Sequence, residues 1–153
     1  MGRTLAQRLN LPFLDTDAAI EESYGIPITQ IFRERGEPVF REAERELIAR
    51  LLSEPQVIAI GGGAFLDQQT REAAIQQART VWLDAPFDLI LARLARSSAR
   101  PLASGKSEQE LRELWNKRRP FYAEAEIRID TSSADPEQIV QLIVAELQQV
   151  GDR

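Results

Sequence analysis

The stretch Val57-Ile58-Ala59-Ile60-Gly61-Gly62-Gly63 decides the fold of this chain. Its four consecutive apolar residues are typical of a strand that is buried on both faces, as strands of parallel sheets are. The run stops at three glycines, which have no Cβ and let the backbone approach a ligand closely. Ligands of open parallel sheets bind just beyond the carboxyl ends of the strands. The stretch therefore predicts a binding floor, with a plain glycine-rich turn into the next helix as the alternative.

On both sides of this stretch, short apolar runs alternate with segments of helical periodicity. The runs predict strands at 12–14, 57–60, 80–84 and 127–130, and the periodic segments predict helices near 1–9, 17–24, 28–33, 38–51, 70–78, 86–94, 107–115 and 136–147. Such alternation predicts an α/β fold in which helices cover both faces of a parallel sheet. No repeat or linker interrupts the chain, so residues 1–153 are expected to form a single domain.

The composition is that of an ordinary globular protein. Its 153 residues suffice for one domain with a proper core, and 43% of them are hydrophobic and 28% charged. A net charge of −5 without a strongly basic stretch argues against a nucleic-acid surface. The apolar runs are too short to span a bilayer, and the N-terminus has no signal-peptide pattern. We therefore expect a cytoplasmic protein.

Two residue types are absent from the chain: it has no cysteine and no histidine. The lack of cysteine excludes disulfides, thiol nucleophiles and thiolate metal sites. The lack of histidine removes the commonest general base and the commonest metal ligand. Any chemistry must use carboxylates, arginine, lysine, hydroxyls or backbone amides. This set suits phosphoryl transfer, in which positioning and charge neutralisation dominate.

Two carboxylates stand in Asp15-Thr16-Asp17, just after the first predicted strand. Residues two apart in an extended chain point the same way, so both carboxylates can face one site. Such a pair suits a magnesium ion, usually held through water, or a substrate hydroxyl. The alternative is structural, with Thr16 or Asp17 as the N-cap of the next helix and a solvated acid beside it.

Arginines in three places can bind an anion. Arg41 stands early on its predicted helix, where it can bind a substrate carboxylate or pair with neighbouring glutamates. Arg100 lies in residues 97–106, which have no hydrophobic period and predict a mobile loop, so Arg100 can close over phosphates as part of a lid. Lys117-Arg118-Arg119 is the densest basic cluster and can clamp an anion or form a solvated helix face.

Together these motifs resemble the shikimate kinase family. The resemblance rests on their order along the chain: Asp15-Thr16-Asp17, Phe40-Arg41, Gly61-Gly62-Gly63, Arg100-Pro101-Leu102 and Lys117-Arg118-Arg119-Pro120-Phe121-Tyr122. In addition, Gly2-Arg3-Thr4-Leu5-Ala6 resembles the helix that follows the phosphate-binding loop of that family. The similarity covers essentially the whole chain. It implies a three-layer P-loop-kinase-like fold with a parallel sheet between two layers of helices.

The resemblance implies an activity and a shikimate site. The family transfers the γ-phosphate of ATP to the 3-hydroxyl of shikimate, on the pathway to chorismate and the aromatic amino acids. By resemblance, Asp17 holds the substrate hydroxyls and orients or deprotonates the attacking one. Arg41 and Arg118 match residues that bind the carboxylate. Gly61, Gly62 and Gly63 match the floor under the ring.

The resemblance also implies a nucleotide site. Asp15 matches a residue that contacts Mg²⁺ through water. Arg100 matches a residue that reaches the transferring phosphate from the lid, here residues 97–106. Arg93 matches a position near the adenine. The implied partners are thus shikimate and ATP, with Mg²⁺ as the cofactor, and a monomer without nucleic acid or membrane.

One part of the family pattern does not appear in the printed sequence. The family begins with a central strand and a G-x-x-x-x-G-K-[ST] loop that binds the ATP phosphates. Gly105-Lys106-Ser107 lacks the first glycine of that pattern and does not follow a strand, so we interpret it as a chance match. Without the central strand, two others would lack a neighbour. We therefore expect an internal start or a trimmed sequence just before Gly2-Arg3, and the activity of the chain as printed stays open.

Two alternatives to a shikimate kinase stay open. A degenerate kinase-like domain that binds a small hydroxy acid or a partner protein without catalysis explains the missing loop directly. A kinase for another small polyol acid is less favoured, because the paired arginines and the three glycines match shikimate better. Gluconate kinases, which share the fold, lack the glycine motif and the Arg-Pro-Leu spacing.

Overall fold

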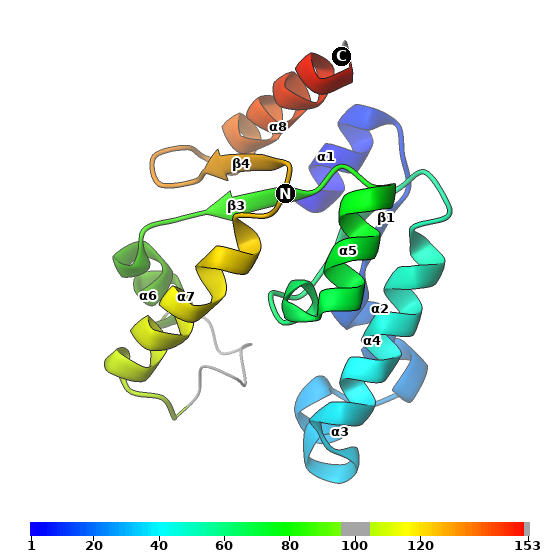
Figure 1. Cartoon of the computed structure of the whole chain (residues 1–153), viewed down its shortest axis with the longest axis vertical. Helices are drawn as coiled ribbons and strands as arrows, with labels where there is room; N and C mark the ends of the chain where they lie inside the picture. Colours follow the sequence, from blue (N-terminus) through cyan, green and yellow to red (C-terminus); the bar gives the residue numbers. More distant parts are fainter. Residues whose placement is uncertain (96–104, 152–153) are drawn as a thin grey trace.

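The computed structural model describes residues 1–95 and 105–151 (Figure 1). Along the chain its elements are α1 (Gly2–Leu9), β1 (Phe13–Asp15), α2 (Thr16–Tyr24), α3 (Ile28–Arg35), α4 (Glu37–Leu51), β2 (Val57–Ala59), the 3₁₀ helix η1 (Ala64–Leu66), α5 (Gln68–Gln77), β3 (Val81–Asp84), α6 (Phe87–Ala95), α7 (Glu108–Tyr122), β4 (Ile127–Asp130) and α8 (Pro136–Gly151). Every predicted strand and helix is present. Only η1 was not predicted. Among the described helices, none has the length and apolar character needed to cross a membrane.

The strands form two parallel pairs rather than one sheet. β1 pairs with β2, and β3 pairs with β4. Within the described residues, each strand therefore has a neighbouring strand on one side only. The prediction that residues 57–60 are buried on both faces is wrong, because the open edge of β2 leaves these residues half-buried.

Two apolar clusters form the core, one beside each strand pair. Ile20, Ile31 and Phe40 join α2, α3 and α4. In the second cluster, the inward-facing residues of β4, Ile127 and Ile129, pack against α8. Figure 1 shows α8 on one side of the β3–β4 pair and α6 and α7 on the other. Helix α1 packs on the second cluster and also contacts β2, so it links the two halves.

The carboxyl ends of β1 and β2 lie beside each other. Asp15 is the N-cap of α2, and its Oδ1 accepts from the backbone N–H groups of Asp17 at 3.0 Å and Ala18 at 3.2 Å. The predicted cap at Thr16 or Asp17 is wrong, because Thr16 is buried and its hydroxyl donates to the Ala59 carbonyl at 3.3 Å. Asp15 lies opposite Ala59 in the strand ladder. The residues after both strands are therefore close.

Candidate active site

Gly61 and Gly63, two of the three glycines after β2, lie against charged side chains from α2 and α4. A Cβ at Gly61 would lie 3.3 Å from Asp17 Oδ1 and 3.3 Å from Glu44 Oε1. A Cβ at Gly63 would lie between 2.5 and 2.7 Å from the Arg41 guanidinium atoms, which is closer than real side chains approach. Gly63 has φ −75° and ψ −30°, a helical conformation, so space rather than backbone geometry requires glycine there.

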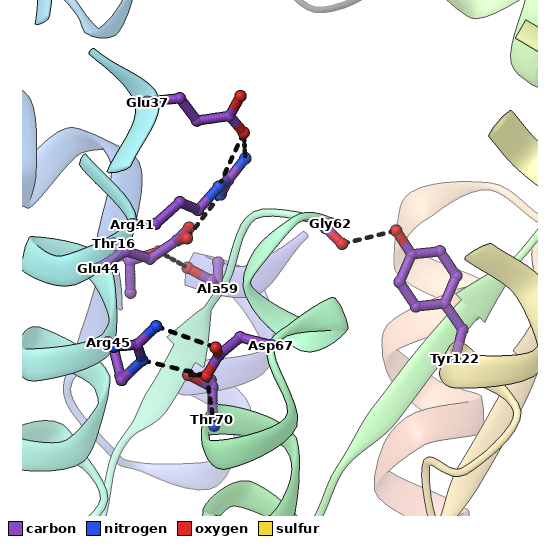
Figure 2. A network of polar contacts seen from close by, with 10 residues as sticks. All are labelled: Thr16, Glu37, Arg41, Glu44, Arg45, Ala59, Gly62, Asp67, Thr70 and Tyr122. Carbon is purple, nitrogen blue, oxygen red and sulfur yellow. Dashed lines mark hydrogen bonds and ion pairs between the residues drawn. The ribbon is translucent and has the colours of Figure 1, made fainter. Parts of the chain in front are cut away.

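Gly62 is contacted from the opposite side by α7. The Tyr122 hydroxyl donates a hydrogen bond of 2.7 Å to the Gly62 carbonyl oxygen (Figure 2). A Cβ at Gly62 would lie 3.8 Å from Arg118 Nη1. Arg119 instead forms an ion pair with the last residue of β3, and Lys117 is exposed. The basic cluster is therefore divided, and only Arg118 is held at the glycines.

Arg41 is fixed by carboxylates of its own helix. Its Nη1 donates to Glu44 Oε2 at 2.6 Å, and its Nε and Nη2 each donate to Glu37 Oε1 at 3.2 Å (Figure 2). Partial burial lowers the pKa of Arg41, but the hydrogen bonds and charges of Glu44 and Glu37 outweigh it and leave that pKa raised. The structural alternative of pairing with nearby glutamates thus holds, although Glu42 pairs with Arg45 instead. These pairs fix the guanidinium against Gly63.

Glu44 lies beside Gly61 at the candidate site, although the sequence did not identify it as a site residue. Its side chain is only 3% exposed. Burial raises the pKa of Glu44, the bond to Arg41 opposes that shift, and the nearby charges of Asp17 and Asp67 raise the pKa further. Helix α4 carries several glutamates, and their spacing alone does not reveal which one is buried. One feature of the sequence could have identified Glu44: it stands three residues after Arg41, so the two side chains share one face of the helix.

Two buried polar atoms beside the glycines make no hydrogen bond within the described residues: Glu44 Oε1 and Arg118 Nε. An unsatisfied buried donor or acceptor costs about 1–3 kcal/mol. One of these atoms is an acceptor and the other a donor. The arrangement can therefore hold a ligand that carries both a carboxylate and hydroxyl groups.

The residues predicted to bind the nucleotide and the metal lie apart from the glycines or outside the described residues, except Asp15 at the end of β1. Asp15 ends β1 and caps α2, whereas the structural alternative had placed this cap at Thr16 or Asp17. Arg93 donates to the carbonyl oxygen of Thr131 at 3.2 Å and to its hydroxyl at 3.4 Å, which holds it at the carboxyl end of β4. Arg100 and most of the predicted lid lie outside the described residues. Among the described residues, no three carboxylates gather closely enough to hold a metal ion by themselves.

Comparison with known proteins identifies relatives over nearly the whole chain. The family model for shikimate kinase matches residues 1–148. A shikimate kinase of Zymomonas mobilis is 41% identical over 149 residues, covering 96% of this chain and 85% of that protein. One of Caulobacter vibrioides is 44% identical over 151 residues, covering 97% and 76%.

Solved structures agree with this result. Shikimate kinase from Acinetobacter baumannii in complex with shikimate has a TM-score of 0.90 and 36% identity, covering 97% of this chain and 84% of that one. The enzyme from Aquifex aeolicus has a TM-score of 0.84 and 31% identity, covering 98% and 88%. A gluconokinase from Sinorhizobium meliloti, at 19% identity and a TM-score of 0.54, shares the fold. The chain belongs to the shikimate kinase family.

Proposed function

We propose that this chain transfers the γ-phosphate of ATP to the 3-hydroxyl of shikimate. The observation that carries the proposal is the convergence of Asp17, Arg41 and Arg118 on the three glycines. A small acid with a carboxylate at one end and hydroxyls at the other matches two arginines and an aspartate in this arrangement. The relative from Acinetobacter baumannii was solved with shikimate, a molecule of this kind.

Arg41 and Arg118 bind the shikimate carboxylate in this proposal. Arg41 is supported from behind by Glu44 and Glu37, so it keeps its charge and its orientation when the substrate is absent. Arg118 Nε has no partner within the described residues, and a carboxylate oxygen would satisfy it. A guanidinium held in place in this way loses little rotamer entropy on binding and can donate two parallel bonds.

Asp17 accepts hydrogen bonds from the substrate hydroxyls and orients the attacking one. Its carboxylate lies beside Gly61, where a Cβ would be 3.3 Å from Oδ1. Because the chain has no histidine, a carboxylate is the available group to accept the hydroxyl proton. Gly61, Gly62 and Gly63 form the floor against which the ring lies.

Nucleotide and metal contacts are a further part of the proposal. Mg²⁺ commonly keeps several waters and binds through one or two carboxylates plus substrate phosphates, and the single carboxylate of Asp15 at the end of β1 fits that pattern. When bound, the ion neutralises charge on the phosphates. Arg93 is assigned to the adenine side and Arg100 to the transferring phosphate. We infer a monomer, because Asp17, Arg41 and Arg118 meet at the glycines without a residue from a second copy, and we infer the cytoplasm, where ATP is available as donor.

The test is a calorimetric titration of the chain with shikimate. We expect saturable binding that Arg118→Met weakens at least tenfold, because a charge-assisted hydrogen bond is worth about 1.5–3 kcal/mol. Lys117→Met is the matched control, since Lys117 is the preceding residue of α7 and is exposed. Absence of binding would contradict the proposal. Release of ADP from ATP and Mg²⁺ on adding shikimate then separates a kinase from a domain that only binds the acid.

A further inference from the structure

Arg71 of α5 makes a set of contacts that the proposed reaction does not use. The residue is 8% exposed, which is unusual for arginine. Its Nη1 donates to the carbonyl oxygens of Phe65 and Leu66, both at 3.2 Å. Its Nε donates to Glu124 Oε2 at 3.0 Å, and its guanidinium lies 4.9 Å from the centre of the Phe121 ring. Arg71 thus contacts two separate segments at once.

The two segments are the two walls of the proposed shikimate site. Phe65 and Leu66 belong to η1, which follows the three glycines directly. Phe121 lies in the last turns of α7 with Arg118 and Tyr122, and Glu124 lies in the turn that directly follows this helix. The hydrogen bond from Tyr122 to the Gly62 carbonyl joins the same two segments a second time.

The fold makes such contacts important. The glycines continue from β2, whereas α7 leads into β4, and these strands belong to different pairs. The contacts of Arg71 and the hydrogen bond of Tyr122 therefore link the glycine segment directly to the end of α7. A planar guanidinium can donate to two carbonyls and a carboxylate together, which a lysine ammonium cannot do with the same geometry.

We propose that Arg71 is a positioning residue that fixes the spacing between the glycine floor and Arg118, and that it thereby sets the affinity for the substrate carboxylate. Arg71 does not touch the substrate. Its effect passes through α7 to Arg118. The inference rests on the proposed function.

The test is a double-mutant cycle on shikimate affinity, measured by calorimetry with the full chain. Arg71→Lys should weaken binding about tenfold, within the range measured for coupled neighbours. In an Arg118→Lys background the same change should cause less than a twofold further loss. Glu124→Gln removes the charge of the half-exposed carboxylate that pairs with Arg71 and should weaken shikimate binding about threefold. It serves as the second variant if Arg71→Lys does not fold.

A merely structural role predicts a different pattern. Arg71→Lys would then lower the unfolding temperature and leave shikimate affinity unchanged in the folded protein, or its effect would simply add to that of Arg118→Lys. Either result overturns the inference.

Arg8→Met is the control, because Arg8 pairs with Glu137 and links α1 to α8 away from the glycines. If the parent chain does not bind shikimate, the proposed function itself fails. If Arg118→Lys weakens binding and neither Arg71→Lys nor Glu124→Gln does, only the inference fails.

Discussion

Gly63→Ala probes the site through a single added methyl group. The new Cβ would lie between 2.5 and 2.7 Å from three guanidinium atoms of Arg41. Ordinary contacts between heavy atoms begin near 3.5 Å, so the guanidinium must move by about 1 Å. The movement is possible because Arg41 is a flexible side chain and 23% exposed. The change should therefore displace the guanidinium that we propose binds the substrate carboxylate, without disrupting the core.

The expected magnitudes follow from two opposing effects on stability. Gly63 is in a helical conformation, so alanine fits the backbone there. Alanine should raise the free energy of unfolding by about 0.4–1 kcal/mol, because it restricts the unfolded chain. Against this, the weakened bond between Arg41 and Glu44 costs up to about 1.5–3 kcal/mol. We expect a net loss of about 1–2 kcal/mol in the free energy of unfolding. Displacing one charge-assisted contact to the substrate should weaken shikimate binding by about 10- to 150-fold.

Calorimetric titration with shikimate measures the affinity, and urea unfolding followed by tryptophan fluorescence checks that the variant is folded. In an Arg41→Met background, Gly63→Ala should produce no further loss of affinity, because the displaced group is already gone. A folded Gly63→Ala variant that binds shikimate within twofold of the parent would refute the reasoning.

Three further predictions concern single side chains. Asp17→Asn should weaken shikimate binding about tenfold in the same titration, because a neutral amide replaces a charged acceptor. Burial raises the pKa of Glu44 above 4.5, so its stabilising contribution is complete below pH 4.5 and is lost as the pH rises through the raised pKa. The unfolding free energy of the parent minus that of Glu44→Gln, measured with urea, should decrease from pH 4.5 to 7; an increase contradicts this. Ser107→Ala should lower the unfolding free energy by about 1 kcal/mol through loss of the α7 capping box, with unchanged shikimate affinity.

Local patterns were sufficient to predict most of the fold. Asp67 and Ser107, residue types that favour helix N-termini, cap α5 and α7, and Gly25 and Gly36 end α2 and α3. Parallel strands bring their carboxyl ends to one edge, which is why the residues after β1 and β2 were expected together. The cap of α2 was less determined, since each residue of Asp15-Thr16-Asp17 can cap a helix. Asp15 becomes the cap because Thr16 is buried against β2, and this burial is a tertiary contact that the local sequence does not show.

The missed features are charged residues that become buried on folding. Glu44 and Arg71 stand among many charged residues on helices, where exposure is the usual expectation. Glu44 differs because α4 places it beside the glycines, and Arg71 differs because its side chain reaches Phe121 and Glu124. The half-burial of β2 has the same kind of cause, because it depends on which strands lie beside it. Periodicity describes one element at a time and does not report its neighbours.

The most direct test of the account is to follow the backbone amide resonances of Gly61, Gly62 and Gly63 during a shikimate titration. If shikimate lies on the glycine floor, all three resonances should shift along one saturation curve, and Arg118→Met should move that curve to higher shikimate concentration. Resonances that stay fixed while shikimate saturates the protein would show binding elsewhere and contradict the account.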